Sequence, residues 1–347
     1  MAAVAPTTDP NPARAVPPEP QPERSALRTV LLLLGNAVAL LLPTTLVVLA
    51  IVWFVPERND YALVSPKKHA WLAAAAGRKV VFVGGSNLAY GLDSSMVERE
   101  TGAHVVNMGM NGYLGVRFML EEVKPNLRRG DIVVVALEYD SFFKSVDGTG
   151  SDLLIVAKAR PENLVHLTWR QRLELLKAMP YVAQQKVLRL IRVGSLSVGK
   201  SDDWKETIDD IESLAGFEKH GDLTSHFGVK WPRHREDGMD LTNTPLDSEV
   251  VGLLASFTKE MNARGVKVII SYTSLIDYFY DRHRASIDGL HALMSGTPPL
   301  VVPSPPTQFV FPEAWFFDTV YHVTEVGRAE RTRRVIRDLR LTALAQP

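Results

Sequence analysis

A buried strand followed by a glycine turn gives this sequence its strongest structural signal: Lys79 to Asp93 read KVVFVGGSNLAYGLD. The continuous apolar run is typical of a strand inside a parallel sheet, and Gly84 and Gly85 allow a tight turn after it. Ser86 is therefore expected between a strand and a helix, where open α/β sheets keep their sites and where developing negative charge is favoured. The alternative is an ordinary helix-capping serine, and only a base elsewhere in the chain would make Ser86 a nucleophile.

Strand and helix patterns alternate after this turn. Further strands are predicted at 103–106, 131–137 and 266–272, and helices at 94–101, 116–127, 248–263 and 327–339. Such alternation is typical of an α/β fold with a parallel sheet.

Residues 30–55 contain no charged side chain. At about 1.5 Å per residue, an apolar helix of this length exceeds the hydrocarbon thickness of a bilayer, so the run predicts a transmembrane helix. A cleaved signal peptide is the alternative, but the run is longer than a usual h-region and no clear small-x-small site follows it.

The segments around this span are expected to differ in kind. The proline-rich residues 1–29 predict a disordered tail, and residues 56–78 a juxtamembrane connector. Basic residues flank both ends of the span and do not decide its orientation. We expect a cytoplasmic tail and an extracytoplasmic domain, periplasmic or on the cell surface. A lone N-terminal span ahead of a large domain most simply acts as an uncleaved signal anchor.

Composition removes several kinds of site. A formal net charge of zero gives no support to nucleic-acid binding. The absence of cysteine excludes disulfides, thiolate catalysis and cysteine-ligated zinc. Neither a metal nor another cofactor is predicted.

A long insertion interrupts the alternation at 141–250, with helical patterns at 170–191 and 204–213 and a polar loop at 217–244. So long an interruption is typical of a lid or a substrate-binding region. The loop carries His220, Asp222, His226 and His234, which suit a sugar or a metal, although no ligand spacing is diagnostic. We expect Asp222 and His226 to contact substrate; a turn with exposed histidines is the alternative.

Asp318 and His322 provide the base that Ser86 needs. A serine hydroxyl becomes a good nucleophile when a base accepts its proton and a third group holds the tautomer of that base. The segment with Asp318 and His322 follows the last core strand, so it opens at the same sheet edge as Ser86. Alone, this pair is better explained as a surface ion pair, but together with the Ser86 turn it predicts a Ser-His-Asp triad.

Four short blocks resemble those of the SGNH hydrolases, in their membrane-anchored branch: GGSN at 84–87, YGLD at 90–93, NMGMNG at 107–112 and FFDTVYHVTEVG at 316–327. That branch includes proteins similar to those serving bacterial polysaccharide acetylation and the D-alanylation of teichoic acids. The resemblance covers 79–140 and roughly 264–340 and leaves the insertion largely unmatched. It implies a flavodoxin-like, three-layer α/β domain over residues 79–340.

The resemblance also implies roles. Ser86 would be the nucleophile, His322 the general base and Asp318 its orienting carboxylate. The backbone N–H groups of Ser86 and Gly112 would help form the oxyanion hole.

Two departures from the family pattern affect these roles. The third block of the family usually presents Gly-x-Asn-Asp, whose asparagine is an oxyanion donor, whereas 137–140 here read LEYD. This donor is missing or is replaced by Asn111 or Tyr139, and Tyr139 is also a candidate substrate contact. The last block has three residues between Asp318 and His322, where two are more common. Loss of one oxyanion donor typically lowers the rate about 100- to 1000-fold.

The sequence thus predicts a membrane-anchored serine esterase or O-acyltransferase acting on an acylated extracytoplasmic polysaccharide or cell-envelope glycan, with a membrane-bound acyltransferase as a possible partner. The alternative is a catalytically weak or inactive SGNH-fold scaffold subunit of an envelope polysaccharide assembly complex. The missing asparagine favours the scaffold, and the co-occurrence of Ser86, Asp318 and His322 favours the enzyme.

Overall fold

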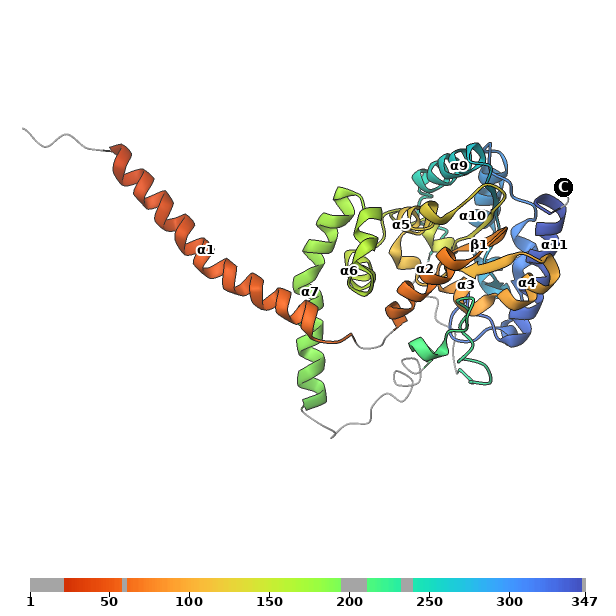
Figure 1. Cartoon of the computed structure of the whole chain (residues 1–347), viewed down its shortest axis with the longest axis horizontal. Coiled ribbons are helices and arrows are strands. Elements are labelled where there is room, and N and C mark those ends of the chain that lie inside the picture. Colours follow the sequence, from red (N-terminus) through yellow and green to blue (C-terminus); the bar gives the residue numbers. More distant parts are fainter. Residues whose placement is uncertain (1–21, 58–60, 195–210, 232–239, 345–347) are drawn as a thin grey trace, which may run out of the picture. The chain divides into compact units, whose positions relative to one another are not determined.

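The computed structural model describes residues 22–57, 61–194, 211–231 and 240–344 (Figure 1). The chain divides into two compact units, 1–50 and 51–347, each considered by itself. Most of the predicted tail, residues 1–21, and part of the predicted helix at 204–213 lie outside the described residues.

Helix α1 (Pro22–Phe54) contains the predicted membrane span. Its segment Ala26–Phe54 is long and apolar enough to cross a membrane, judged by length and composition. The helix begins within the stretch predicted as tail, because a proline is well tolerated in the first turn of a helix and good helix formers follow it.

The second unit is built on a parallel sheet with the strand order β2-β1-β3-β4. These strands are β1 (Lys79–Gly84), β2 (His104–Asn107), β3 (Ile132–Ala136) and β4 (Lys267–Ile270). All four predicted strands are confirmed, and so is the parallel α/β architecture. Strands β1 and β3 are buried along their whole length, as their continuous apolar runs predict.

The order of the strands places a crevice beside Ser86. The chain moves outwards from β1 to β2 and in the opposite direction from β3 to β4. Right-handed crossovers then place the connecting helices on opposite faces of the sheet. Where the direction reverses, a crevice opens at the carboxyl ends of the strands. Gly84 at the end of β1 pairs with Ala136 at the end of β3, so the residues that follow both strands meet in this crevice.

Two groups of helices cover the sheet. One contains α3 (Ser86–Gly91), α4 (Ser94–Thr101) and α11 (Glu325–Thr342), which packs on both; the other contains α5 (Val116–Glu121) and α9 (Ser248–Ala263). The predicted helices at 94–101 and 248–263 are confirmed. Helix α5 is shorter than predicted because Pro125, which lacks an amide donor, enters a separate 3₁₀ turn.

The insertion contributes α6 (Gly150–Ala159) and α7 (Trp169–Gly194), which pack together (Figure 1). A further helix, α10 (Asp277–Ser295), was not predicted, although its buried residues Phe279, Tyr280, Ile287, Leu290 and Met294 follow a helical period. It follows β5 (Leu275–Ile276), which pairs with β6 (Val310–Phe311). The 3₁₀ turns are η1 (Tyr61–Leu63), η2 (Gly112–Leu114), η3 (Lys124–Asn126), η4 (Tyr139–Phe142), η5 (Pro161–His166), η6 (Leu214–Gly216), η7 (Pro306–Phe309) and η8 (Glu313–Trp315).

The predicted connector includes a helix, α2 (Val64–Ala74), that is built into the second unit. Lys68 is fully buried, and its Nζ donates hydrogen bonds to the carbonyl oxygens of Asn107, Gly109 and Gly221 at 2.8, 2.8 and 2.7 Å. Burial lowers the pKa of Lys68 to about 7. This lysine joins α2 to the end of β2 and to the loop of the insertion.

Candidate active site

The turn before Ser86 depends on a close approach of two strands. A Cβ atom on Gly84 would lie 2.2 Å from the carbonyl oxygen of Ala136 on β3, so a larger residue does not fit there. One residue, Gly85, separates the end of β1 from Ser86, which begins α3. The predicted strand, turn and helix are all present.

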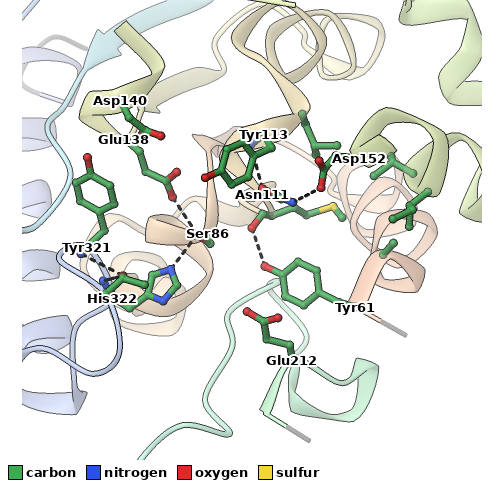
Figure 2. A pocket seen from close by; sticks show the side chains of 16 residues that line it. Tyr61, Ser86, Asn111, Tyr113, Glu138, Asp140, Asp152, Glu212, Tyr321 and His322 are labelled. Carbon is green, nitrogen blue, oxygen red and sulfur yellow. Dashed lines mark hydrogen bonds between the residues drawn. The ribbon is translucent and has the colours of Figure 1, made fainter. Parts of the chain in front are cut away.

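Ser86, His322 and Asp318 form a continuous hydrogen-bonded chain. The Ser86 Oγ lies 2.8 Å from His322 Nε2, and His322 Nδ1 lies 2.7 Å from Asp318 Oδ1. Figure 2 shows the imidazole directed at Ser86 from the loop before α11. The predicted approach of Ser86 and His322 is confirmed as a contact.

A tight turn accommodates the three residues between Asp318 and His322. The backbone N–H of Phe317 donates to the carbonyl oxygen of His322 at 2.8 Å, and the N–H of His322 donates to Thr319 Oγ1 at 3.1 Å. The extra residue therefore does not separate the carboxylate from the imidazole.

Asp318 and Tyr90 contact the imidazole from different sides of the site. Burial by itself lowers the pKa of His322, but the Asp318 carboxylate, with further contributions from Glu138 and Glu212, outweighs it, and the pKa is raised. The ring of Tyr90 stacks on the imidazole, with centroids 3.8 Å apart and planes 3° apart. Tyr90 lies four residues after Ser86, on the same face of a helix, which is the signal by which the sequence could have identified it.

Glu138 completes the contacts of Ser86 and was missed by the sequence analysis. Its Oε1 lies 2.9 Å from Ser86 Oγ and accepts a hydrogen bond from the backbone N–H of Asn87 at 3.0 Å (Figure 2). Glycines make room for this carboxyl group. A Cβ atom on Gly85 would lie 2.6 Å from its Oε1, and a Cβ atom on Gly112 would lie 2.2 Å from its Oε2.

The surroundings of Glu138 raise its pKa. Burial raises its pKa most, and the nearby Asp140 raises it further. The Asn87 N–H, the His322 charge and the Ser86 hydroxyl lower it, but the pKa remains above the ordinary value of a glutamate.

Of the two candidates for a replacement oxyanion donor, Asn111 has other partners and Tyr139 lies outside the lining of the cavity. The Asn111 side-chain amide donates to Asp152 Oδ1 at 2.8 Å, while its oxygen accepts from the Tyr113 backbone N–H at 2.9 Å. Tyr139 is buried, and its ring stacks with that of Tyr272 at 6.0 Å. Tyr139 does not line the cavity at Ser86, contrary to its expected role as a substrate contact.

Asp222 also does not line the cavity at Ser86. Its carboxylate is fully buried and accepts hydrogen bonds from the backbone N–H and Oγ of Ser94, from Asn107 Nδ2 and from Arg328 Nη2 at 2.6 to 2.9 Å. A carboxylate with this many internal donors joins elements of the fold. The expected substrate contact is therefore wrong for Asp222.

His226 is buried behind the imidazole of His322. Its Nε2 lies 3.0 Å from the carbonyl oxygen of Val323, and its ring packs against Tyr90 with centroids 4.8 Å apart. Burial lowers the pKa of His226 to about 4, so the ring is neutral near pH 7. His226 also does not line the cavity, and its expected substrate contact is wrong.

No group of three or more possible metal ligands is found among the described residues. His234, which the sequence analysis included in its polar cluster, lies outside those residues.

A cavity of about 390 Å³ opens at Ser86 and His322. Its lining includes three tyrosines and four carboxyl groups: Tyr61, Tyr113, Tyr321, Glu138, Asp140, Asp152 and Glu212. Neither lysine nor arginine is among the described residues that line it. The insertion reaches the cavity through Asp152, Ile155 and Val156 on α6 and through Glu212, and not through its loop around residue 222.

No protein-family model matches the chain, and no curated protein matches it. Among solved structures, it is similar to an acetyl xylan esterase, Est2A, from the rumen bacterium Butyrivibrio proteoclasticus, with 11% sequence identity and a TM-score of 0.32. The likeness covers 76% of this chain and 64% of the esterase, so the chain spans less than two thirds of the length of that protein. It concerns the path of the backbone and not the chemistry.

Proposed function

We propose that this protein is a serine esterase or O-acyltransferase of the SGNH hydrolase type. The observation that carries the proposal is the hydrogen-bonded chain from Ser86 through His322 to Asp318 at the carboxyl edge of the parallel sheet. A carboxylate that accepts the Nδ1 proton leaves Nε2 free to take the proton of the serine.

The reaction follows from this geometry. Ser86 Oγ attacks the acyl carbonyl carbon while His322 Nε2 accepts the hydroxyl proton, and Asp318 stabilises the resulting imidazolium. His322 then returns the proton to the leaving alkoxide, which leaves an acyl group on Ser86. Water or a sugar hydroxyl attacks this acyl-serine in turn, with His322 again taking the proton. Hydrolysis and acyl transfer therefore use the same three side chains.

The substrate that we propose is an acyl ester of an extracytoplasmic polysaccharide or cell-envelope glycan. The tyrosines of the cavity offer apolar faces for sugar rings, and its carboxyl groups can accept hydrogen bonds from sugar hydroxyls. A membrane-bound acyltransferase is the proposed partner for the transfer reaction.

We further propose that α1 anchors the protein, with the tail cytoplasmic and the second unit extracytoplasmic. The length and apolar composition of Ala26–Phe54 support the anchor. Protease added to intact cells without an outer barrier is expected to digest the C-terminal unit and to spare a tag at Met1. Digestion of the tag with survival of the C-terminal unit would reverse this orientation.

One observation favours the alternative of a non-enzymatic scaffold: the Glu138 carboxyl group fills the space beside Ser86. A fluorophosphonate probe separates the two functions, because it labels an activated serine without the natural substrate. We expect the full-length protein to be labelled at Ser86 and the Ser86→Ala variant to remain unlabelled. A folded wild-type protein that takes no label would favour the scaffold.

A further inference from the structure

The hydrogen-bond pattern at Ser86 limits where protons can be. The Ser86 hydroxyl has one hydrogen but two close partners, His322 Nε2 at 2.8 Å and Glu138 Oε1 at 2.9 Å. If the Nδ1 proton of a neutral His322 points to Asp318, then Nε2 must accept the serine hydrogen. The contact between Ser86 and Glu138 is then satisfied only when Glu138 is a carboxylic acid and donates to Ser86 Oγ.

A second arrangement has the same number of protons. Glu138 is ionised and accepts the Ser86 hydrogen, and His322 carries both ring protons and donates to Asp318 and to Ser86. In that arrangement His322 cannot act as a base. If both groups lose their proton, two acceptors compete for one hydrogen, which is unfavourable. Glu138 and His322 therefore titrate as a pair that shares one proton.

We propose that Glu138 is a catalytic residue which, as a carboxylic acid, donates a hydrogen bond to the oxyanion together with the backbone N–H of Asn87. This inference rests on the proposed acyl chemistry at Ser86. It assigns to Glu138 the work that the resemblance to SGNH hydrolases gives to an asparagine.

The position of the carboxyl group supports this assignment. It contacts both the attacking atom, Ser86 Oγ, and a backbone donor, the Asn87 N–H, which donates to its Oε1, so it stands where a substrate carbonyl oxygen has to lie. A small rotation of the glutamate side chain would admit that oxygen and keep the acid group beside it. An ionised carboxylate in this place would repel the developing negative charge, whereas a carboxylic acid stabilises it.

The groups that face Glu138 determine its protonation. Asp140 lies on η4, the turn that directly follows Glu138, and its carboxylate is paired with Lys144 at 2.6 Å. Tyr61 faces it from η1, and Tyr321 and His322 face it from the loop before α11. Within the described chain, His322 is the cationic group that lowers the pKa of Glu138. Its imidazole cannot be charged while it acts as the base. Burial and Asp140 therefore keep the pKa of Glu138 raised in the active form.

The test is the pH dependence of kcat/KM for a small activated ester, measured with the full-length wild type, Glu138→Gln and Glu138→Ala. For the wild type, kcat/KM should follow a bell-shaped pH profile. It should fall at low pH because His322 is protonated, and at high pH because Glu138 and His322 lose the proton that they share. In Glu138→Gln the carboxamide N–H remains at every pH, so the alkaline fall should disappear while the plateau stays within about tenfold of the wild-type maximum. Glu138→Ala should lose about 100- to 1000-fold relative to the wild-type maximum, and its alkaline fall should also disappear, because no carboxyl group remains at this position.

Thermal unfolding of all three proteins identifies variants that fail to fold. If Glu138→Ala does not fold, the comparison of Glu138→Gln with the wild type is sufficient to test the inference. An alkaline fall that persists in Glu138→Gln would overturn the inference. So would a folded Glu138→Ala with wild-type activity. Each of these results leaves the proposed function intact if Ser86→Ala is inactive. Equal activity of wild type and Ser86→Ala would instead remove the proposed function itself.

Discussion

An alanine at position 86 is expected to lower kcat for a small activated ester by about four to six orders of magnitude. The variant lacks the attacking oxygen, while His322 and Asp318 keep their hydrogen bond to each other. Only binding and the oxyanion donors then accelerate the reaction. Release of a chromophoric alcohol from an aryl acetate by the purified full-length protein measures this loss.

Two further variants show whether Ser86 and His322 act as one unit. His322→Ala should lose nearly as much activity as Ser86→Ala, and the double variant should lose little more than either. Ser95→Ala is the matched control, because Ser95 lies on α4 and its hydroxyl contacts the His220 ring at 3.2 Å, away from the cavity. If Ser86→Ala keeps more than about one hundredth of the activity, another group performs the hydrolysis.

Replacing Asp222 with alanine is expected to lower the free energy of unfolding by about 3 to 5 kcal/mol. The change removes the carboxylate that pairs with the buried guanidinium of Arg328 at 2.9 Å. It also leaves the buried donors of Ser94 and Asn107 without this acceptor. The variant would therefore lose the carboxylate that connects the loop of the insertion to α4, β2 and α11. Denaturant unfolding of the full-length protein in detergent, followed by tryptophan fluorescence, measures the effect.

Asp281→Ala provides the control for this measurement. Asp281 is an exposed aspartate on α10 that pairs with Arg284 three residues later, so its removal should leave the unfolding midpoint nearly unchanged. An Asp222→Ala variant with wild-type stability but poor turnover of the natural glycan would restore Asp222 to the substrate site.

The sequence predicted the parallel strands and the approach of Ser86 to the Asp318 and His322 segment because each depends on a local signal. A buried apolar run, a glycine turn and the common edge of a parallel sheet are sufficient for both. The contact between Glu138 and Ser86 depends instead on the register of β1 against β3, in which Gly84 pairs with Ala136. The register of these two strands is fixed by tertiary packing, so the sequence does not predict the contact of the Glu138 carboxyl group with Ser86. The departure of this third block from the family pattern is visible in the sequence, but its structural consequence is not.

The polar loop of the insertion was misinterpreted for a different reason. A loop rich in aspartate and histidine has the same composition whether it faces a sugar or holds a fold together. The partners of Asp222 are Ser94, Asn107 and Arg328, which lie more than 100 residues from it in the chain. Composition cannot show that such donors converge on one carboxylate. Helix α6, which does reach the cavity, carries an apolar pattern typical of simple packing.

The buried side chain of Lys68 has a practical consequence for producing the second unit without α1. A fragment cut at Lys79, where the predicted domain begins, would lose the donor for the carbonyl oxygens of Asn107, Gly109 and Gly221. It would also lose Tyr61, whose hydroxyl donates to the Met110 carbonyl oxygen at 2.6 Å in the wall of the cavity. A version without α1 that is suited to crystallisation therefore has to start upstream of Tyr61, since Tyr61 and Lys68 both donate hydrogen bonds to backbone carbonyl oxygens of the folded part.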